Sequence, residues 1–408
     1  MNLRFNNVTY NLFYLFVCIV WAPVQMYYLK IDGAALTIFM LSIVALILNL
    51  PILFGKKGSL RSPIFKCWLV LVLYSFLNSL VKGFEAPTGP MIYLRANFIT
   101  PLVFLIITII TLDKDKYRCL KTILAAQILY ILMGIFHFTI TGRDDRLLAE
   151  GLGNLLPLMS VSAVFVAGVL FCEDKLKRGW LFFFFIVILA MFATVASATR
   201  KAFGAIVLMV VGVLIGKNKK LVPRTLLLTS IALVTIYIGF NWVMDNTFMG
   251  ERFLNNEQYD FVLSKNARVN DFLIKVLGDR SLFYYYGIQI FKQHPITGIG
   301  LTNFISVTQI NVRIHSEYIV QLCENGIIGF GLLMLFYGLI LKRLKKKRKE
   351  RTNYMVYLFG LLAILFINLT AWTYNMNYTM IVYAVLINYT YSSSNYEISN
   401  TSPQRQLQ

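Results

Sequence analysis

Long apolar runs recur along the chain from Asn11 almost to the C-terminus, and short polar segments separate them. Most runs are about 15 to 24 residues long, which is enough for an α-helix to cross a hydrocarbon core of about 30 Å. The expected fold is therefore an all-α polytopic membrane protein with twelve spans. The pattern predicts them near residues 11–29, 34–54, 66–82, 98–112, 121–140, 155–172, 180–196, 203–216, 225–241, 318–341, 354–371 and 377–391.

The composition agrees with a membrane protein. Hydrophobic residues make up 58% of the chain and charged residues only 14%, whereas a soluble domain has about a quarter of its residues charged. The net charge of +20 does not indicate a nucleic-acid partner, because its distribution follows the connections between apolar runs. No small-x-small cleavage site is evident near the first run, so we expect it to be a span and not a signal peptide.

Basic residues set the expected orientation. Because basic connections stay in the cytoplasm, both termini and the tail 392–408 are expected there. The last basic connection is expected to anchor the orientation, with binding to acidic headgroups as the alternative. The five basic connections, each with three to eight Lys or Arg residues, are 55–66, 113–121, 173–179, 217–224 and 342–353.

The cysteines and histidines do not predict a metal or disulfide site. No cysteine falls in an expected external connection, so no disulfide framework is expected. No cluster of Cys and His has the spacing of metal ligands, and neither a metal nor a cofactor is expected. The cysteines are Cys18, Cys67, Cys119, Cys172 and Cys323.

One connection is much longer than the others. Residues 241–317 form an expected external, periplasmic loop between a bundle of about nine spans in residues 1–240 and the last three spans in 318–391. The other connections are short. The chemistry of the protein is therefore expected at the membrane surface, beside this loop.

The second half of this loop has a clear pattern. Residues 267–279 and 280–293 have apolar residues at one-face helical spacing, which predicts two short amphipathic helices. His294 and Pro295, followed by Gly298 and Gly300, predict a turn. We expect these short helices to pack over the outer mouth of the bundle.

Several arginines fall on the external side, against the usual charge bias. An Arg guanidinium group matches phosphate through two parallel hydrogen bonds. Arg200 lies in a tight turn between two apolar spans, and Arg143 and Arg146 lie in another external connection. The alternative for Arg200 is that it reaches lipid phosphates. Surface charge is the expected role of the others, Arg95, Arg252, Arg268 and Arg313.

His315 lies directly before the expected span 318–341. A neutral imidazole accepts a proton from a sugar hydroxyl near pH 7, and Glu317 and Glu324 are candidates to orient it. The alternative is an ordinary polar residue at a helix start. His137, inside an expected span, and His294, before a proline, are expected to be structural.

Two stretches resemble the signature of the O-antigen ligase and polymerase superfamily. From Arg280 to Phe304 an Arg precedes an aromatic helix, then come His-Pro, a Gly-x-Gly turn at Gly298 and Gly300, and Asn-Phe.

The second stretch has His315 and Ser316, nine further residues, and then Gly326 and Gly329. The turn SATRKAFG, which contains Arg200, resembles the family's Ser-Arg turn, although Thr199 precedes the Arg here. The rest of the chain is similar in topology only.

The resemblance implies a function and an architecture. Members transfer glycans from an undecaprenyl-diphosphate carrier at the outer face of the bacterial cytoplasmic (inner) membrane, need no metal, and have a fold similar to the GT-C glycosyltransferases. Arg200 and Arg280 are then expected to bind the diphosphate, and His315 to activate the acceptor hydroxyl. The expected partners are the lipid-linked glycan, membrane lipid and a chain-length regulator.

Polymerase and ligase differ in their acceptor, and the motif does not separate them. The sequence after Gly326 lacks the Gly-x-x-Gly-Thr-Thr ending of some ligases, which favours an O-antigen or capsular repeat-unit polymerase over a ligase that transfers glycan to lipid A core. A lipid-glycan flippase or other transporter is the alternative from another class. Many transporters are built from two repeated halves, and the two halves of this chain show no such repeat, which argues against this alternative.

Overall fold

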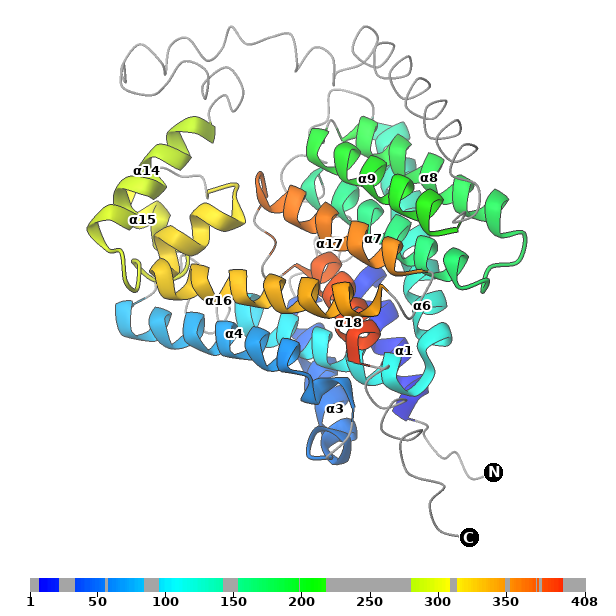
Figure 1. Cartoon of the computed structure of the whole chain (residues 1–408), viewed down its shortest axis with the longest axis horizontal. Coiled ribbons are helices and arrows are strands. Elements are labelled where there is room, and N and C mark those ends of the chain that lie inside the picture. The colour runs from blue at the N-terminus through cyan, green and yellow to red at the C-terminus, as the bar shows by residue number, and fades with distance from the viewer. Residues whose placement is uncertain are drawn as a thin grey trace, which may run out of the picture.

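The computed structural model describes residues 7–21, 34–55, 58–83, 95–141, 153–197, 199–217, 280–308, 314–348, 353–371, 373 and 376–391, and this part of the chain is helical without strands. Two π-helical stretches, Val17–Trp21 and Arg95–Ile99, adjoin α1 and α6, and a 3-10 turn, Ser59–Arg61, precedes α4. The α-helices (Figure 1) are α1 (Asn7–Phe16), α3 (Ala34–Leu53), α4 (Pro63–Lys82), α6 (Thr100–Thr141), α7 (Gly153–Cys172), α8 (Gly179–Ala196), α9 (Arg200–Lys217), α14 (Arg280–Gln293), α15 (Phe304–Thr308), α16 (Glu317–Lys347), α17 (Tyr354–Asn368) and α18 (Asn377–Tyr391).

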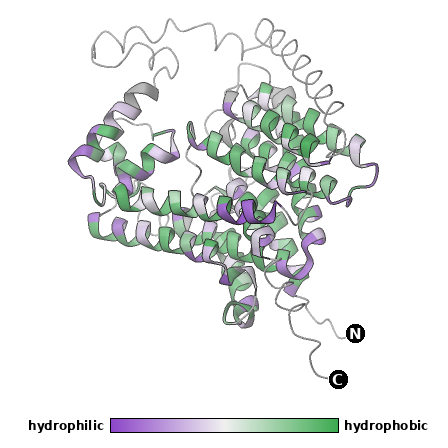
Figure 2. Ribbon diagram, viewed as in Figure 1, coloured by the Kyte–Doolittle hydropathy of each residue, from purple (hydrophilic) through white to green (hydrophobic). Residues whose placement is uncertain are grey.

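Within the described residues, five helices are long and apolar enough to cross a membrane: α3, α4, α6, α7 and α16. Shorter apolar helices occur at Asn7–Val20, Gly179–Val195 and Tyr354–Asn368. Figure 2 shows hydrophobic residues along most of the length of the bundle helices. Their outer faces carry large apolar side chains such as Leu181 and Ile188, which are 73% and 68% exposed. A surface of this kind is suited to lipid and not to water, so the chain is a multi-pass membrane protein.

The helices match most of the expected spans. Expected spans 34–54, 66–82, 155–172, 180–196, 203–216, 354–371 and 377–391 each correspond to one helix, and 318–341 lies within α16. The expected span 225–241 and the external loop as far as residue 279 lie outside the described residues. The total of twelve spans and the assignment of sides therefore stay predictions.

Two expected spans, 98–112 and 121–140, both fall within α6 and its π-helical start. The helix is interrupted at Asp115, whose φ of −149° and ψ of 82° are not helical. On the first half, Phe98 packs edge-to-face against Phe76 of α4 with ring centroids 5.4 Å apart. On the second half, Gln127 donates a hydrogen bond of 2.9 Å to Ser162 of α7. Asp115 thus divides α6 into two helices with different neighbours, as the basic connection 113–121 predicts.

The described parts of the five basic connections are joined by contacts. The carboxylate of Asp113 accepts hydrogen bonds from Ser59 and from Asn388 of α18, over 2.7 and 2.8 Å. Lys116 forms an ion pair of 2.6 Å with Glu173. These connections therefore lie together, as expected for one side of a membrane. The same network continues on α17 and α18, where the Tyr357 hydroxyl donates to Glu173 and the ring of Tyr357 stacks on that of Tyr389. The remaining two basic connections join it because Lys347 donates to the Tyr389 carbonyl and Lys217 forms an ion pair with Asp174.

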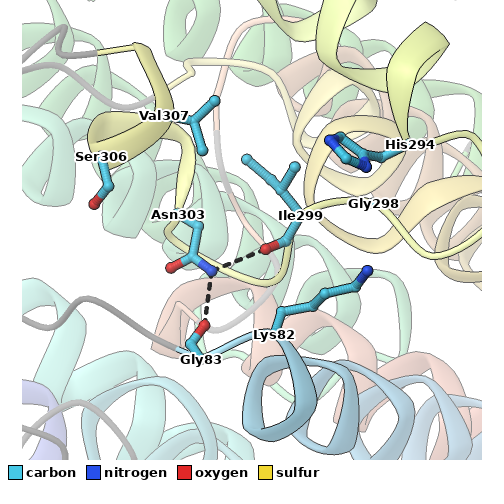
Figure 3. Close-up of a pocket in the computed structure, with 8 residues that line it drawn as sticks. All are labelled: Lys82, Gly83, His294, Gly298, Ile299, Asn303, Ser306 and Val307. Atoms are coloured by element: carbon cyan, nitrogen blue, oxygen red, sulfur yellow. Dashed lines mark hydrogen bonds between the residues drawn. The ribbon is translucent and has the colours of Figure 1, made fainter.

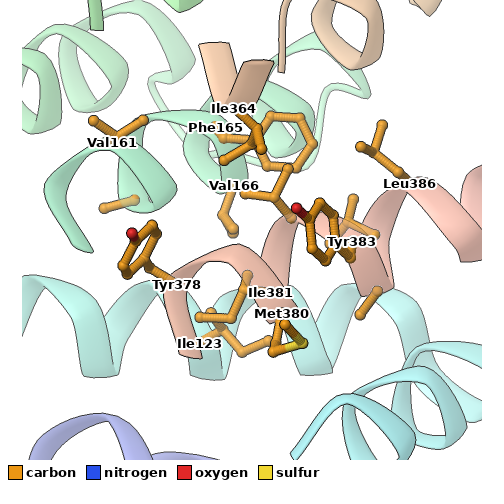
Figure 4. Close-up of a cluster of buried hydrophobic side chains, with 14 of the residues drawn as sticks. Ile123, Val161, Phe165, Val166, Ile364, Tyr378, Met380, Ile381, Tyr383 and Leu386 are labelled. Carbon is orange, nitrogen blue, oxygen red and sulfur yellow. The ribbon is translucent and has the colours of Figure 1, made fainter. Parts of the chain in front are cut away.

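Helix α18 is the centre of the main hydrophobic core. Every residue from Tyr378 to Thr390 is buried, and Figure 4 shows its side chains among those of α6, α7 and α17. A second, smaller cluster joins α14, α15 and the start of α16, and consists of Ile290, Ile299, Phe304, Ile314, Val320 and Cys323.

Candidate functional site

The turn after α14 is held in an unusual backbone conformation. Helix α14 ends at Gln293, and the predicted turn follows, with Gly298 and Gly300 at φ of +68° and +91°. A Cβ on Gly298 would lie 2.5 Å from the backbone carbon of Glu324. Glycine is therefore required at Gly298 both by the left-handed backbone and by the close approach of α16.

Helix α16 is broken at the point where this turn meets it. Gly326 has φ +63° and ψ −165°, which divides α16 into a short first segment and a long second one. A Cβ on Gly326 would lie 2.3 Å from the carbonyl oxygen of Ile296. Gly326 is therefore a point of close packing between α16 and the turn. Gly329 is buried one turn later, beneath the side chains of Asn325 and Gln321.

Four backbone hydrogen bonds join the turn to the break. The amides of Ile299 and Gly300 donate to the carbonyls of Cys323 and Glu324, over 3.1 and 2.8 Å. In the opposite direction, the amides of Ile327 and Ile328 donate to the carbonyls of Pro295 and Ile296, over 2.8 and 3.5 Å. Breaking a helix frees amide and carbonyl groups that need partners. The turn supplies them, so the two resembling stretches form one structural unit.

Helix α4 closes the other side of this unit. The Asn78 amide donates to the carbonyls of Thr297 and Glu324, over 2.7 and 3.1 Å, and the Tyr74 hydroxyl donates to the Asn325 carbonyl over 3.0 Å. These side chains come from the N-terminal part of the chain, far in sequence from either motif. They hold the turn and the break against the bundle.

Three segments that carry predicted site residues converge on residues 368–371, here called the α17 turn. The hydroxyl of Tyr284, one helical turn after Arg280, donates to the Leu369 carbonyl over 2.6 Å. The ammonium group of Lys201, next to Arg200, donates to the Thr370 carbonyl over 3.2 Å. The amide of Glu317, two residues after His315, donates to the Ala371 carbonyl over 3.0 Å.

The α17 turn therefore brings the starts of α9, α14 and α16 together through three successive carbonyl oxygens. Carbonyl groups at a helix C-terminus lack partners within the helix, so each can bind a different segment. Ser316 adds a further hydrogen bond, of 3.3 Å, to the Asn368 carbonyl. The segments that carry positions 200, 280 and 315, which are 80 and 35 residues apart along the chain, thus lie around one turn.

The predicted site residues differ in how much of them the structure describes. Arg200 and Arg280 are the first residues of α9 and α14, and their side chains are outside the described part. Arg143 and Arg146 lie outside the described residues altogether. His315 is half-buried, and Glu324 is buried. The proposed roles of these groups stay predictions, and the structure supplies the positions of their segments.

Glu317 is fully buried at the start of α16, where its two carboxylate oxygens have different partners. One accepts from the Gln321 amide over 2.9 Å, and the other from the backbone amide of Thr373 over 2.7 Å. The Gln321 oxygen in turn accepts from the Asn325 amide over 2.9 Å. Glu317, Gln321 and Asn325 thus form a ladder of hydrogen bonds in which each side-chain amide donates toward Glu317. Glu317 is the last acceptor of the ladder, and this position suits an ionised carboxylate, which only accepts hydrogen bonds.

Sequence reasoning missed the α17 turn, Lys201 and the role of α4. Lys201 carries the same signal as Arg200, a basic residue in an expected external turn, and could have been selected by the same argument. The α17 turn has no comparable signal, because its contacts use carbonyl oxygens that every residue possesses. Among the described residues, no group of three or more His, Cys, Asp and Glu side chains is placed to hold a metal ion.

Residues 184–334 match the family described as O-antigen ligase. No curated protein sequence matches the chain. The matched residues include Arg200, Arg280 and the unit of turn and broken helix, whereas Arg143, Arg146 and the α17 turn lie outside the match.

Proposed function

Residues 184–334 belong to the O-antigen ligase family, a family of glycosyltransferases, and from this premise we propose that the protein transfers a glycan from a polyprenyl-diphosphate carrier to an acceptor hydroxyl. The carrier is undecaprenyl diphosphate, and the reaction takes place at the outer face of a bacterial cytoplasmic membrane. The chain is a multi-pass membrane protein, so both reacting groups meet it at the surface of the bilayer. Nucleotide sugars stay in the cytoplasm, which makes a lipid-linked donor necessary on this face.

The observation that carries this proposal is the α17 turn. It joins the segments of Arg200, Arg280 and His315 through three successive carbonyl oxygens. A transfer from a lipid diphosphate needs cationic donors for the leaving group and a base for the attacking hydroxyl. The segments that meet at this turn carry two arginines and a histidine, the residue types that match these two requirements.

In the proposed reaction the acceptor oxygen attacks the anomeric carbon of the donor sugar. A new glycosidic bond forms, the bond from that carbon to the diphosphate oxygen breaks, and the electron pair leaves with the diphosphate. His315 takes the proton of the attacking hydroxyl. Attack from the side opposite the leaving group inverts the anomeric configuration.

The arginines stabilise the negative charge that develops on the bridging oxygen. Donors that bind this charge more tightly in the transition state than in the ground state lower the barrier. Arg200 and Arg280 are proposed for this role, with Arg143 and Arg146 as further ligands of the diphosphate. Glu317, Glu324 and the motif glycines support the segments that carry the reacting groups.

Of the two activities found in the family, polymerase and ligase, we favour the polymerase. Its acceptor is another lipid-linked repeat unit, so both substrates share one carrier. Loss of a polymerase leaves lipopolysaccharide capped with a single repeat unit, or capsule of very short chains. Loss of a ligase instead leaves long glycan chains on the lipid carrier. Analysis of the glycans made by a deletion strain distinguishes the two.

The test of the proposed reaction uses the purified full chain with lipid-diphosphate-linked repeat units and no nucleotide. Chain extension is expected. Replacement of the base, in H315Q or H315A, is expected to lower the rate by about 10²- to 10⁴-fold, with an unchanged thermal midpoint. The exposed Lys292 at the end of α14 offers a matched control, and K292Q should retain full activity. A folded H315Q protein with the wild-type rate would overturn the assignment of His315.

A further inference from the structure

Helix α16 folds back on itself at Gly326. In a continuous α-helix, Ser316 and Tyr337 would lie about 31 Å apart, because each residue adds about 1.5 Å. In the structure both contact Asn368, the last residue of α17. The Ser316 hydroxyl donates to its backbone carbonyl over 3.3 Å, and its side-chain amide donates to the Tyr337 hydroxyl over 2.6 Å. The break therefore makes α16 a hairpin, with residues 317–325 as its first arm and residues 327–347 as its second arm.

The closed end of this hairpin is fixed by backbone bonds and by Asn303. Four hydrogen bonds join the break at Gly326 to the turn after α14. The Asn303 amide donates to the carbonyls of Gly83 and Ile299, over 2.7 and 2.8 Å, which ties that turn to the end of α4 (Figure 3). Gly326 and His315 are at opposite ends of the first arm, which is about 13 Å long. A separate contact is therefore needed to fix the end that carries His315.

The open end of the hairpin is held by the side chain of Asn368. Its oxygen accepts from the Thr373 hydroxyl over 2.6 Å, and its amide donates to the Tyr337 hydroxyl over 2.6 Å. The backbone amide of Thr373 in turn donates to the Glu317 carboxylate over 2.7 Å. One carboxamide thus connects the start of the first arm, through Thr373, to the middle of the second arm, through Tyr337.

These groups are enclosed in the protein interior. Asn368, Thr373 and Glu317 are each 0% exposed, and Tyr337 is 5% exposed. The Tyr337 hydroxyl also lies 2.7 Å from the hydroxyl of Tyr383 in α18. In a membrane bundle, hydrogen bonds between buried side chains hold helices together, because no water replaces a lost partner. The contacts of Asn368 therefore oppose an opening of the hairpin.

We propose that Asn368 is a positioning residue for glycan transfer, whose side chain sets the place of His315 by closing the open end of the α16 hairpin. The proposal rests on the proposed function, in which His315 takes the proton of the acceptor hydroxyl. Asn368 acts through Thr373 and Glu317 and has no contact with the substrate. A base must lie within hydrogen-bond reach of the proton that it takes, and a displacement of about 1 Å costs up to about 10²-fold in rate.

A kinetic test removes single contacts of the Asn368 side chain. T373V keeps the backbone amide that bonds Glu317 and removes the hydroxyl that bonds Asn368, whereas T373S keeps both. T373V and N368A are expected to lower kcat about 10- to 100-fold at unchanged KM for donor and acceptor, and T373S should keep the wild-type kcat. A wild-type kcat in T373V and N368A, or an equal loss in T373S, would overturn the proposal. A raised KM at unchanged kcat would overturn it too, because the contact would then serve substrate binding.

A matched control separates positioning from stability. Asn388 of α18 is also a buried asparagine, and its amide donates to Asp113, in the basic connection 113–121, over 2.8 Å. N388A and N368A should both lower the thermal midpoint, because each removes a hydrogen bond of a buried side chain. Only N368A should lower kcat. An equal fall of kcat in N388A would show that Asn368 acts through stability alone and would refute the proposal.

A distance measurement decides the role of Asn368 without turnover. All five native cysteines are buried, so spin labels can be directed to introduced cysteines in the full chain. L322C lies on the first arm and L341C on the second, and the two positions would be about 28 Å apart in a continuous helix. A shorter and narrow distance distribution is expected in the otherwise unchanged chain and in N388A, and a broader one in N368A and T373V.

The two measurements separate this proposal from the proposed function. The same narrow distribution in N368A and T373V would refute the role of Asn368, even for a chain that transfers no glycan. A broadened distribution at unchanged kcat would also refute it and would leave glycan transfer by His315 unaffected. The expected distances in a folded chain that transfers no glycan would refute the proposed function, and with it the catalytic consequence of the Asn368 contacts.

Discussion

The backbone amide of Ile327 donates a hydrogen bond of 2.8 Å to the carbonyl oxygen of Pro295. This bond joins the long segment of α16 to the turn that follows α14. It exists because Gly326, the preceding residue, interrupts the helix and turns the amide outward. The position of His315 relative to the turn thus depends on a backbone break that a glycine permits.

Substitution of Gly326 is expected to separate these elements. In G326A the left-handed backbone would carry a side chain, which costs about 1–3 kcal/mol, and the added Cβ would lie 2.3 Å from the Ile296 carbonyl oxygen. A lower thermal midpoint and loss of glycan transfer are expected. Gly331 in the same helix has open space around it, and G331A should be neutral or stabilising by up to about 1 kcal/mol. Equal midpoints for the two variants would contradict this account.

The hydrogen bond from Tyr284 to the α17 turn can be removed without altering the packing of the ring. Because a hydrogen bond contributes about 0.5–1.5 kcal/mol, Y284F is expected to lower kcat/KM about two- to tenfold with little change in the thermal midpoint. The neighbouring Tyr285 is the matched control, and Y285F should behave as wild type. If both variants transfer glycan at the wild-type rate, the α17 turn does not position α14 for the reaction.

The hydrogen-bond ladder of Glu317, Gln321 and Asn325 can be tested by exchanging the side chains of Glu317 and Gln321. In E317Q the new amide faces two donors, the Gln321 amide and the Thr373 amide, and one donor lacks a partner at a cost of about 1–3 kcal/mol. The double variant E317Q/Q321E restores an acceptor for each donor. Its thermal midpoint should recover most of the loss measured for E317Q.

The activity of the same double variant then separates two roles of Glu317. Recovery of both midpoint and activity indicates that Glu317 acts by holding the start of α16. Recovery of the midpoint alone indicates that the carboxylate itself is needed beside His315. A double variant less stable than E317Q would refute the direction of the ladder.

The orientation can be tested with single cysteines. All five native cysteines are buried, so they should react slowly with a membrane-impermeant maleimide. Ile296 is 63% exposed beside the turn after α14, and I296C is expected to react in intact cells. K177C, in the basic connection 173–179, is expected to react only after the membrane is permeabilised. The reverse pattern would show that the orientation from basic residues is inverted.

Much of the fold could be predicted from the sequence, because a membrane span needs an apolar run of a certain length. Even the division of α6 at Asp115 was predictable, since the charged connection around it cannot remain in hydrocarbon. The aromatic helix 280–293 and the turn at Gly298 also agree with the pattern. Local chemistry determines these elements.

The relations between elements were less predictable. The sequence marks Gly298 and Gly326 as unusual, but it does not show that they meet, because the four hydrogen bonds between their segments use backbone atoms. Glu317 was expected to orient His315, and this role stays a prediction, whereas the hydrogen bonds that its carboxylate accepts from Gln321 and Thr373 had no signal in the sequence.

The enclosed position of α18 has a consequence for how the protein is made. It is the last of the described helices to leave the ribosome, yet every residue from Tyr378 to Thr390 is covered by helices synthesised earlier. The helices that enclose α18 therefore cannot reach their final packing before this last described helix has been inserted among them. A chain that ends before α18 would leave the same helices without their central packing partner.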